Sequence, residues 1–313
     1  MWPQRSIRNA LAVGLVALSI GPAAAQTTQP GAPVVYRLDK GTTYQVGCFP
    51  PCDCPLLEEV PVRGTFVLTP AGADPLFTYY EVRDVNWTVS LGNPEIPITG
   101  SGKYKIGGEF ALQQQLSLDL KVGDAAVQHF DTGLVTGPAP FPAIAVTLSI
   151  NGQYCFDTVI RMSASPVPSS QIQPYRLLSE STFQRGCFGP CLCPVEQEPI
   201  RGTFALVPLQ QNPLFTEFAV VDVDWRVTLP NSAADIPVRG FGTYRFGGEV
   251  AATQELSLDL SVGDQPLTHY DSGITAGGQN FPRIDILISI EGAYCYDTLI
   301  DVHAAPRKKA SLR

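Results

Sequence analysis

An internal repeat is the feature that most constrains how this chain can fold. After residue 33, most of the first half of the chain recurs in the second half, with the matching segments in the same order. The clearest matches are Tyr36-Arg37-Leu38 with Tyr175-Arg176-Leu177, Arg63-Gly64-Thr65-Phe66 with Arg201-Gly202-Thr203-Phe204, Leu116-Ser117-Leu118-Asp119-Leu120 with Leu256-Ser257-Leu258-Asp259-Leu260, and Tyr154-Cys155-Phe156-Asp157-Thr158 with Tyr294-Cys295-Tyr296-Asp297-Thr298. A period of this length is too long for a solenoid unit and is the size of a whole domain. The sequence therefore predicts two homologous domains, residues 34–164 and 172–306, joined by a short, semi-stiff Pro/Ser linker at residues 165–171.

Alternation of polar and apolar residues indicates that each copy is built from β-strands. Residues 115–122 and 255–262 alternate without interruption, and Ile, Val and Leu recur at every second position in residues 143–150 and 283–290. A period of two is typical of strands with one face in a core and the other in water. Gly-Gly, Gly-Asp and Asn-Gly pairs between these segments supply the positive φ angles of tight hairpins. We therefore expect an all-β fold of two tandem homologous antiparallel domains, each a meander of about seven to nine strands forming a β-barrel or a β-sandwich.

The first residues have the order of a bacterial-type secretory signal. Arg5 and Arg8 precede an apolar run from Ala10 to Ile20, and a Gly-Pro pair separates this run from Ala23-Ala24-Ala25. This order predicts a signal peptide at residues 1–25 that is cleaved after Ala25. The run is too short for a permanent anchor, and no later segment approaches the ~20 apolar residues of a transmembrane helix. We expect a secreted or periplasmic mature chain with no transmembrane segment.

Composition and charge narrow the class of partner. Residues 26–33 are expected to form a disordered N-terminus and residues 307–313 a solvated basic tail. Apolar residues make up 44% of the chain and charged residues 16%, which is enough apolar material to bury a core. The net charge is −8, and it becomes more negative once Arg5 and Arg8 are removed with the signal peptide. Such a surface disfavours nucleic acid and anionic lipid as partners.

Each copy carries four cysteines in the pattern Cys-x3-Cys-x-Cys, followed by a distant fourth. They are Cys48, Cys52, Cys54 and Cys155 in the first copy and Cys187, Cys191, Cys193 and Cys295 in the second. An even number per domain behind an export signal predicts disulfides. A bridge from Cys52 to Cys54 would close a very small ring, so we expect one bridge inside the loop from Cys48 to Cys54 and one from that loop to Cys155. The alternative is a four-thiolate metal site or a redox pair, but the loop offers no positive charge to stabilise thiolates.

Two histidines occupy equivalent positions in the copies. His129 precedes Asp131 by two residues and His269 precedes Asp271 by two, so in a strand each pair points to the same face. One His and one carboxylate are weak candidates for a metal site or an acid/base pair, because each domain supplies a single such His. We favour hydrogen-bonded histidines beside a hairpin.

Several segments resemble a known family. Tyr36-Arg37-Leu38-Asp39, Val62-Arg63-Gly64-Thr65-Phe66, His129-Phe130-Asp131 and Phe141-Pro142-Ala143-Ile144 are similar in their layout to YceI-like periplasmic proteins. The resemblance implies a lipocalin-like antiparallel barrel that holds a polyisoprenoid-type lipid in an apolar lumen. That family lacks the four-cysteine pattern and is usually a single domain. The Cys-Phe-x-Pro-Cys-x-Cys-Pro signature is closer to uncharacterised secreted bacterial proteins.

The sequence holds no Gly-x-Ser-x-Gly, His-Glu-x-x-His, phosphate-binding glycine loop or EF-hand pattern. We therefore expect no catalytic residues and no cofactor, and interpret the chain as a secreted non-enzymatic binding or structural module whose tandem domains raise avidity for a protein or surface partner. The alternative is an extracytoplasmic carrier of an apolar, isoprenoid-like small molecule. A metal or redox protein that uses the cysteines is less favoured.

Two further expectations concern side-chain placement. Alternating aliphatic residues and one Trp per copy suffice to fill a small barrel or sandwich; they are Leu116, Leu118, Leu120 and Val122, or Ile284, Ile286, Ile288 and Ile290, with Trp87 or Trp225. We therefore expect a packed interior with no continuous apolar pocket of ~300 Å³ or more. Phe49 and Phe188 follow the first cysteine of each loop, and we expect them to be surface contact residues on a covalently stiffened loop.

Overall fold

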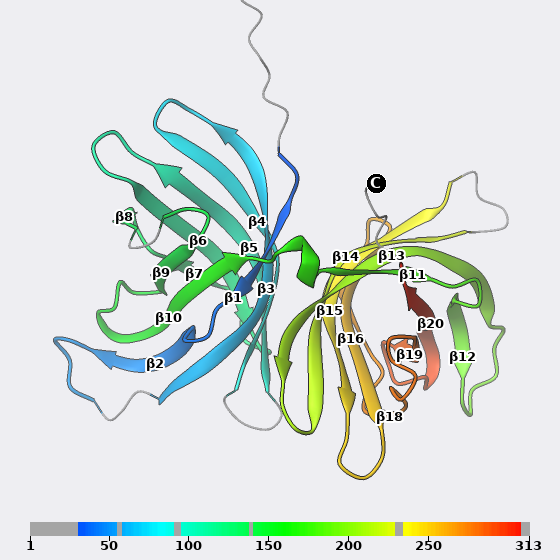
Figure 1. Ribbon diagram of the computed structural model, residues 1–313. Helices are drawn as coiled ribbons and strands as arrows, with labels where there is room; N and C mark the ends of the chain where they lie inside the picture. Colours follow the sequence, from blue (N-terminus) through cyan, green and yellow to red (C-terminus); the bar gives the residue numbers. More distant parts are fainter. Residues whose placement is uncertain (1–30, 55–57, 91–94, 138–139, 229–233, 308–313) are drawn as a thin grey trace, which may run out of the picture.

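The computed structural model describes residues 31–54, 58–90, 95–137, 140–228 and 234–307. The predicted signal peptide, and all of the predicted basic tail except Arg307, lie outside the described residues. The described chain forms two antiparallel sheets of ten strands each, joined by the short 3-10 helix η1 (Ser169–Gln171) (Figure 1). None of its helices is long and apolar enough to cross a membrane. The predicted all-β fold with tandem domains is confirmed.

The first sheet closes on itself. Its strands are β1 (Val34–Leu38), β2 (Thr43–Phe49), β3 (Glu58–Ala73), β4 (Phe77–Val89), β5 (Ile96–Gly107), β6 (Gln113–Val122), β7 (Gln128–Asp131), β8 (Val135–Thr136), β9 (Ile144–Ser149) and β10 (Cys155–Pro166). Pairing runs from β2 in chain order through β7, then through β9 to β10, and β10 pairs back with β2. This ring of eight strands makes the domain a barrel rather than a sandwich. The closure at β7 and β9 is narrow, with one residue pair, Asp131 and Ser149.

The strand count exceeds the predicted seven to nine because one side of the ring is broken and one short strand is added. β1 and β2 both pair with β3 and β10, so together they fill one place in the ring. At the break, the buried Thr42 hydroxyl donates to the Ser163 carbonyl at 2.9 Å and accepts from the Ser163 N–H at 3.1 Å. The side chain therefore replaces the missing ladder bonds. The short strand β8 pairs only with β6.

The second copy repeats this architecture. Its strands are β11 (Gln173–Leu177), β12 (Thr182–Phe188), β13 (Glu196–Gln211), β14 (Phe215–Val227), β15 (Ile236–Gly247), β16 (Thr253–Val262), β17 (Thr268–Asp271), β18 (Thr275–Ala276), β19 (Ile284–Ser289) and β20 (Cys295–Pro306). The ring closes in the same way, through β12 and β20. Ser181 and His303 repeat the bonds of Thr42 and Ser163.

Each barrel is filled by its own side chains. Leu116, Leu118 and Leu120 are buried as predicted, together with Trp87. The rings of Tyr36 and Phe66 stack with centroids 5.3 Å apart, and Phe66 meets Trp87 edge-on at 6.1 Å. Tyr175, Phe204 and Trp225 repeat this arrangement in the second barrel. Most of the residues predicted to fill the interior therefore do so, with large aromatic rings at its centre. Val122 is only partly buried, and Ile290, which follows the end of β19, is 38% exposed.

The barrels pack side by side through strands β3 and β4 of the first and β13, β14 and β15 of the second (Figure 1). An apolar cluster joins them and consists of Val35, Val67, Val167, Ala205, Val207, Ala219 and Val221. Around it, Arg63 Nε donates to Glu217 Oε2 at 2.8 Å, and Asn86 Nδ2 donates to the Gly242 carbonyl at 2.6 Å.

The linker is shorter than predicted and takes part in this contact. Ser165 and Pro166 still belong to β10, where they pair with Arg37 and Tyr36. Val167, the next residue, is buried in the apolar cluster between the barrels. The Pro and Ser content of the segment predicted a spacer, whereas its one large apolar residue anchors it.

Candidate functional site

The hairpin between β9 and β10 is held rigidly at one end of the first barrel. The buried carboxylate of Asp157 accepts backbone N–H bonds from Gln153 at 2.7 Å, Thr158 at 2.7 Å and Asn151 at 3.0 Å. Gln153 and Cys155 have positive φ angles of 60° and 51°, which residues other than Gly rarely adopt. Asp297 and its neighbours repeat these bonds and angles in the second copy. The carboxylate therefore stabilises a turn that the backbone alone would disfavour.

Two disulfides per copy fix the cysteine loop to this hairpin. Cys48 is bonded to Cys54 within the loop, and Cys52 is bonded to Cys155 at the start of β10. Cys187–Cys193 and Cys191–Cys295 are the corresponding bridges. The predicted arrangement, one bridge inside the loop and one to the distant cysteine, is confirmed. Among the described residues no cysteine is free. Four disulfides indicate an oxidising compartment outside the cytoplasm.

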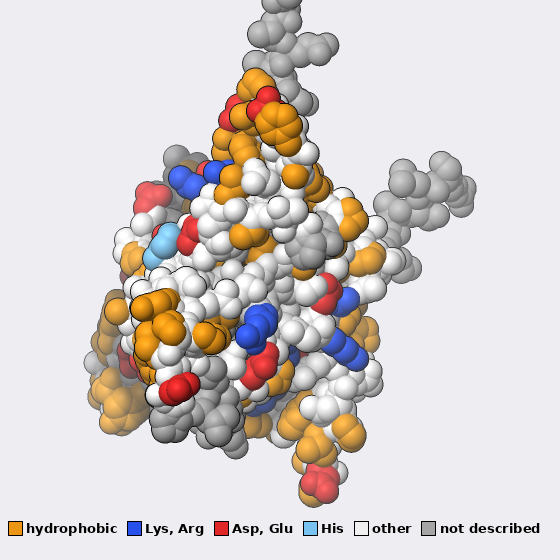
Figure 2. Space-filling model, turned by 90° about the vertical axis from the view of Figure 1, so that its left-hand side faces the viewer, with side chains coloured by type: hydrophobic (Ala, Val, Ile, Leu, Met, Phe, Trp, Pro, Cys, Tyr) orange, Lys and Arg blue, Asp and Glu red, His pale blue; other side chains and the backbone are white. Residues whose placement is uncertain are grey.

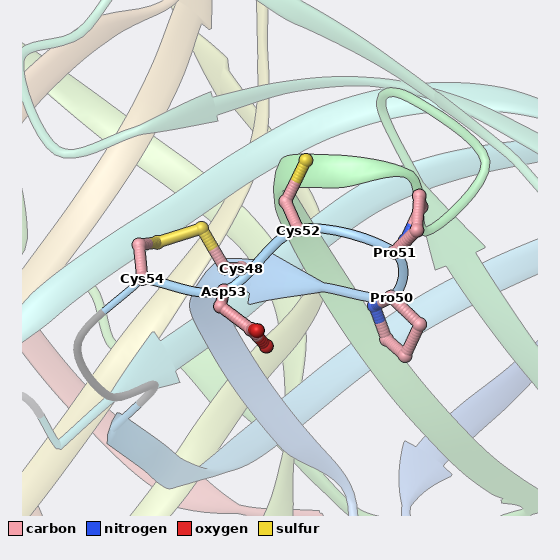
Figure 3. A pocket seen from close by; sticks show the side chains of 6 residues that line it. All are labelled: Cys48, Pro50, Pro51, Cys52, Asp53 and Cys54. Atoms are coloured by element: carbon pink, nitrogen blue, oxygen red, sulfur yellow. A yellow bond between two sulfur atoms is a disulfide. The ribbon is translucent and has the colours of Figure 1, made fainter.

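The loop between Cys48 and Cys54 curls around an open hollow of about 510 Å³ that its own side chains line (Figure 3). Figure 3 shows the bridge from Cys48 to Cys54, with the Cys52 side chain pointing away from it. Pro50 and Pro51 form one wall of the hollow, and Asp53 is its charged residue. The hollow is shallow and solvent-facing, so it suits contact with a surface better than enclosure of a small ligand.

Exposed aromatic rings flank the distant cysteine in both copies. Tyr154 and Phe156 are 60% and 65% exposed, and Tyr294 and Tyr296 are 64% and 65% exposed. We call each pair, with its disulfide to the cysteine loop, an aromatic tip. β2 and β12, which lead into the two loops, lie on the outer sides of the barrels, away from the contact between them (Figure 1). Large rings in water on a rigid, cross-linked support lose little entropy on binding.

The expectation that Phe49 is a surface contact residue is wrong. Phe49 is the last residue of β2, still paired with Cys155 in the ladder to β10, and its ring is only 6% exposed. Phe188 is half-buried at the end of β12, and its role stays a prediction. The exposed rings are instead those beside Cys155 and Cys295. The signal for them was present in the sequence, because aromatic residues flank the fourth cysteine in both copies.

The two histidines make hydrogen bonds across strands rather than along them. His129 Nδ1 lies 2.8 Å from Asp119 Oδ1 on β6, and His269 Nδ1 lies 2.9 Å from Asp259 Oδ1 on β16. Asp131 accepts from Gln115 instead, while Asp271 lies 3.9 Å from His269 Nε2. The hydrogen bond to Asp259, followed by the charges of Asp259 and Asp271, raises the pKa of His269 despite its partial burial.

A serine completes a polar row in each copy. Ser117 Oγ lies 3.3 Å from His129 Nε2, and Ser257 Oγ lies 3.5 Å from His269 Nε2. The order Ser, His, Asp is that of a hydrolase relay, in which the Asp is buried and orients the imidazole. Here the side chains of His129 and Asp119 are 61% and 63% exposed, so water competes for each contact. In the part of the chain that the structure describes, no group of three His, Cys, Asp or Glu residues could hold a metal ion.

Comparisons with known proteins returned no match to a family model, to a curated protein or to a solved structure.

Proposed function

We propose that this chain is an exported, non-enzymatic binding protein that holds its partner through the two aromatic tips. The observation that carries the proposal is the exposure of Tyr154 and Phe156, and of Tyr294 and Tyr296, beside a disulfide in both copies. A soluble domain gains nothing in stability from rings that stay in water, so their recurrence favours a role in contact. The disulfides and the predicted signal peptide support export to an oxidising compartment.

A protein surface is the partner that best fits this chemistry. Tyr and Phe are enriched in the cores of protein interfaces, where they contribute large contact area at small entropic cost. The loop beside the first tip supplies an acidic residue, Asp53, and the whole chain carries a net charge of −8. Both disfavour nucleic acid and anionic lipid. Two tips on one chain let a second contact form at high effective concentration after the first.

The carrier of an apolar small molecule gains no support from the interior. The closed ring of eight strands agrees with the lipocalin-like architecture that the resemblance to YceI-like proteins implies. However, Tyr36, Phe66 and Trp87 fill the centre of the first barrel, and their counterparts fill the second. An eight-stranded barrel offers a lumen for one ligand only where side chains leave it open.

Site-specific photo-cross-linking tests the proposal in the cells that make the protein. A benzophenone amino acid replaces Phe156 in one variant and Tyr296 in another. The control places it at Phe110, which is 95% exposed on the hairpin between β5 and β6, at the opposite end of the barrel. We expect positions 156 and 296 to cross-link the same partner and position 110 to give no such product.

Aromatic-to-serine variants supply the second measurement. Replacing Tyr154 and Phe156 by Ser should weaken attachment to the captured partner. Replacing Tyr294 and Tyr296 by Ser as well should weaken attachment by more than the sum of the losses expected if the two tips bound independently. Thermal stability should hardly change, because the rings are exposed. Equal cross-linking at all three positions, or attachment that survives loss of all four rings, would overturn the proposal.

A further inference from the structure

The same outer sheet face is covered in the second barrel and open in the first. In the second barrel, the face of β14 and β15 is where the first barrel docks. Ala219 and Val221 lie in the apolar cluster between the barrels, and Phe241 is only 4% exposed. In the first barrel, the equivalent face of β4 to β7 is open and forms a hollow of about 460 Å³. We call it the polar hollow; it is lined by Glu81, Val82, Arg83, Ser101, Gly102, Lys103, Ser117, Asp119 and His129.

Part of this face is shared by the two copies and part has diverged. The glycine and the Ser, Asp and His of the polar row are the same in both. The positions that differ surround them, with Ala219, Val221, Phe241 and Thr243 in the second copy where the first has Glu81, Arg83, Ser101 and Lys103. The second copy thus has the residues of a buried interface, whereas the first has residues that are stable in water and suit a polar partner.

A backbone carbonyl, that of Gly102 in the first copy and Gly242 in the second, lies at the centre of the face. β4 and β14 each carry a β-bulge beside the glycine, between Val82 and Val85 and between Val220 and Val223. A bulge disrupts the ladder and exposes backbone groups. In the second copy, the Gly242 carbonyl at the bulge accepts the Asn86 side-chain amide at 2.6 Å. Across residues 31–307, excluding the undescribed gaps, no side chain donates to the corresponding Gly102 carbonyl.

Glycine is required at this position for steric reasons. A Cβ atom on Gly102 would lie 2.0 Å from the Ser117 carbonyl oxygen, and one on Gly242 would lie 2.0 Å from that of Ser257. The close approach of β5 to β6, and of β15 to β16, leaves no room for a side chain on the inward face of the strand, beside Leu118 and Leu258. The contact of Asn86 with the Gly242 carbonyl shows that a donor from outside the barrel can reach this acceptor directly.

One cation that lines the polar hollow forms no ion pair with the residues that the structure describes. Arg83 is ion-paired with Glu81, and His129 lies against Asp119. Lys103 has no hydrogen bond or ion pair with any described residue, and its side chain lines the hollow next to Gly102. An occupant that donates to the Gly102 carbonyl therefore gains most if it also brings a carboxylate to Lys103.

We propose that the polar hollow is a docking site for a polypeptide segment of a partner protein, with an Asn or Gln amide donating to the Gly102 carbonyl and an Asp or Glu carboxylate paired with Lys103. The contact of Asn86 with Gly242 is the precedent for the first interaction, and the unpaired Lys103 selects the second. Figure 2, which views the molecule from the side of the first barrel, shows a His side chain on the surface with acidic, Lys and Arg side chains near it. This site is separate from the aromatic tips and does not depend on them.

Titration of the isotope-labelled mature protein with the peptide acetyl-Asn-Gly-Glu-amide tests the proposal by amide chemical shifts. We expect saturable shifts at Gly102, Lys103 and Ser117, and none around Gly242, which the first barrel covers. Lys103→Thr introduces the residue of the second copy and should weaken binding about two- to fivefold, as for loss of an exposed ion pair.

Lys105→Thr is the matched control, because it removes a Lys from the same strand that lies over the Phe77 ring at 5.1 Å and outside the hollow. Its affinity for the peptide should equal that of the unmodified chain. Shifts that are absent from the hollow, spread equally over both copies, or unchanged in Lys103→Thr would overturn the docking site. An equal loss of peptide affinity in both Lys variants would show that only the overall charge matters, and it would also overturn the docking site.

Discussion

Asp157 accepts a hydrogen bond from the backbone N–H of Gln153 at 2.7 Å, and this bond holds Gln153 at a positive φ angle of 60°. The same buried carboxylate accepts from Ile150, Asn151 and Thr158. Asp157→Ala would leave these donors without a partner under the turn. We expect the free energy of unfolding to fall by about 2 to 4 kcal/mol, measured by denaturant unfolding. Asp124→Ala, at an exposed turn, is the control and should lose little; a comparable loss in both would contradict the role assigned to Asp157.

The two disulfides of a copy should differ in their contribution to stability. The bridge from Cys52 to Cys155 spans 103 residues, whereas that from Cys48 to Cys54 spans 6. Because a longer loop restricts the unfolded chain more, replacing Cys52 and Cys155 together by Ser should cost about 4 to 5 kcal/mol, against about 2 kcal/mol for the short bridge. Thermal and denaturant unfolding of the two double variants measure the difference. The reverse order would mean that the short loop stabilises the native state directly.

Stability should rise on mild acidification because of a carboxylate at the contact between the barrels. Burial, followed by the negative charge of Asp222, raises the pKa of Asp84. Burial also raises the pKa of Asp222. A carboxyl with a raised folded pKa binds its proton more tightly in the folded state, so stability increases as the pH falls through that pKa and stops increasing below the unfolded pKa.

Asp84→Asn removes this charge while keeping a residue that tolerates the positive φ angle of 52° at the bulge. The variant should be more stable than the unmodified chain at neutral pH and should gain less on acidification. Unfolding curves at several pH values measure both effects. A variant that is less stable at neutral pH would show that the Asp84 charge is compensated in the folded state.

Much of the fold follows from alternation in the sequence. Residues 115–122 and 255–262 became β6 and β16, because a strict period of two fits only a strand with one buried face. The pairing of the cysteines was narrowed by ring size. The sequence alone did not distinguish a barrel from a sandwich. Closure of the ring depends on the pairing of Asp131 with Ser149, and no local sequence pattern links these two residues.

The candidate site was less predictable from the sequence. Phe49 lies next to a cysteine loop, but its ring is buried because β2 continues one residue further than the loop residues indicate. The partner of His129 is Asp119, on a neighbouring strand, and only strand register reveals this. Spacing in the sequence pointed to Asp131, because spacing reveals which residues are neighbours along one strand and does not reveal neighbours on an adjacent strand.

The asymmetry of the contact between the barrels leads to a prediction about each barrel alone. Each contains its own ring of strands and its own disulfides, so residues 31–166 and residues 173–307 should both fold. The second barrel alone would expose Val207, Val221 and Phe241, which are nearly fully buried in the whole chain. The first barrel alone would expose the smaller pair Val35 and Val67, and its face equivalent to β14 and β15 is polar. We therefore expect the second barrel to self-associate as its concentration rises and the first to stay monomeric, as measured by sedimentation equilibrium.

Residues taken from the first copy should reverse the behaviour of the second barrel. Ala219→Glu, Val221→Arg and Phe241→Ser introduce the residues that the first copy carries at those positions. Because these side chains lie on the outer face, the changes leave the core of the barrel intact, and the isolated second barrel should become monomeric with little change in its unfolding midpoint. In the whole chain the same changes should have the opposite consequence, since they place charges against Val35 and Val67 in the contact between the barrels. The barrels should then unfold as two separate transitions. If the second barrel still self-associates after these changes, the surface through which it associates lies elsewhere. If the whole chain keeps a single unfolding transition, the linker alone couples the barrels.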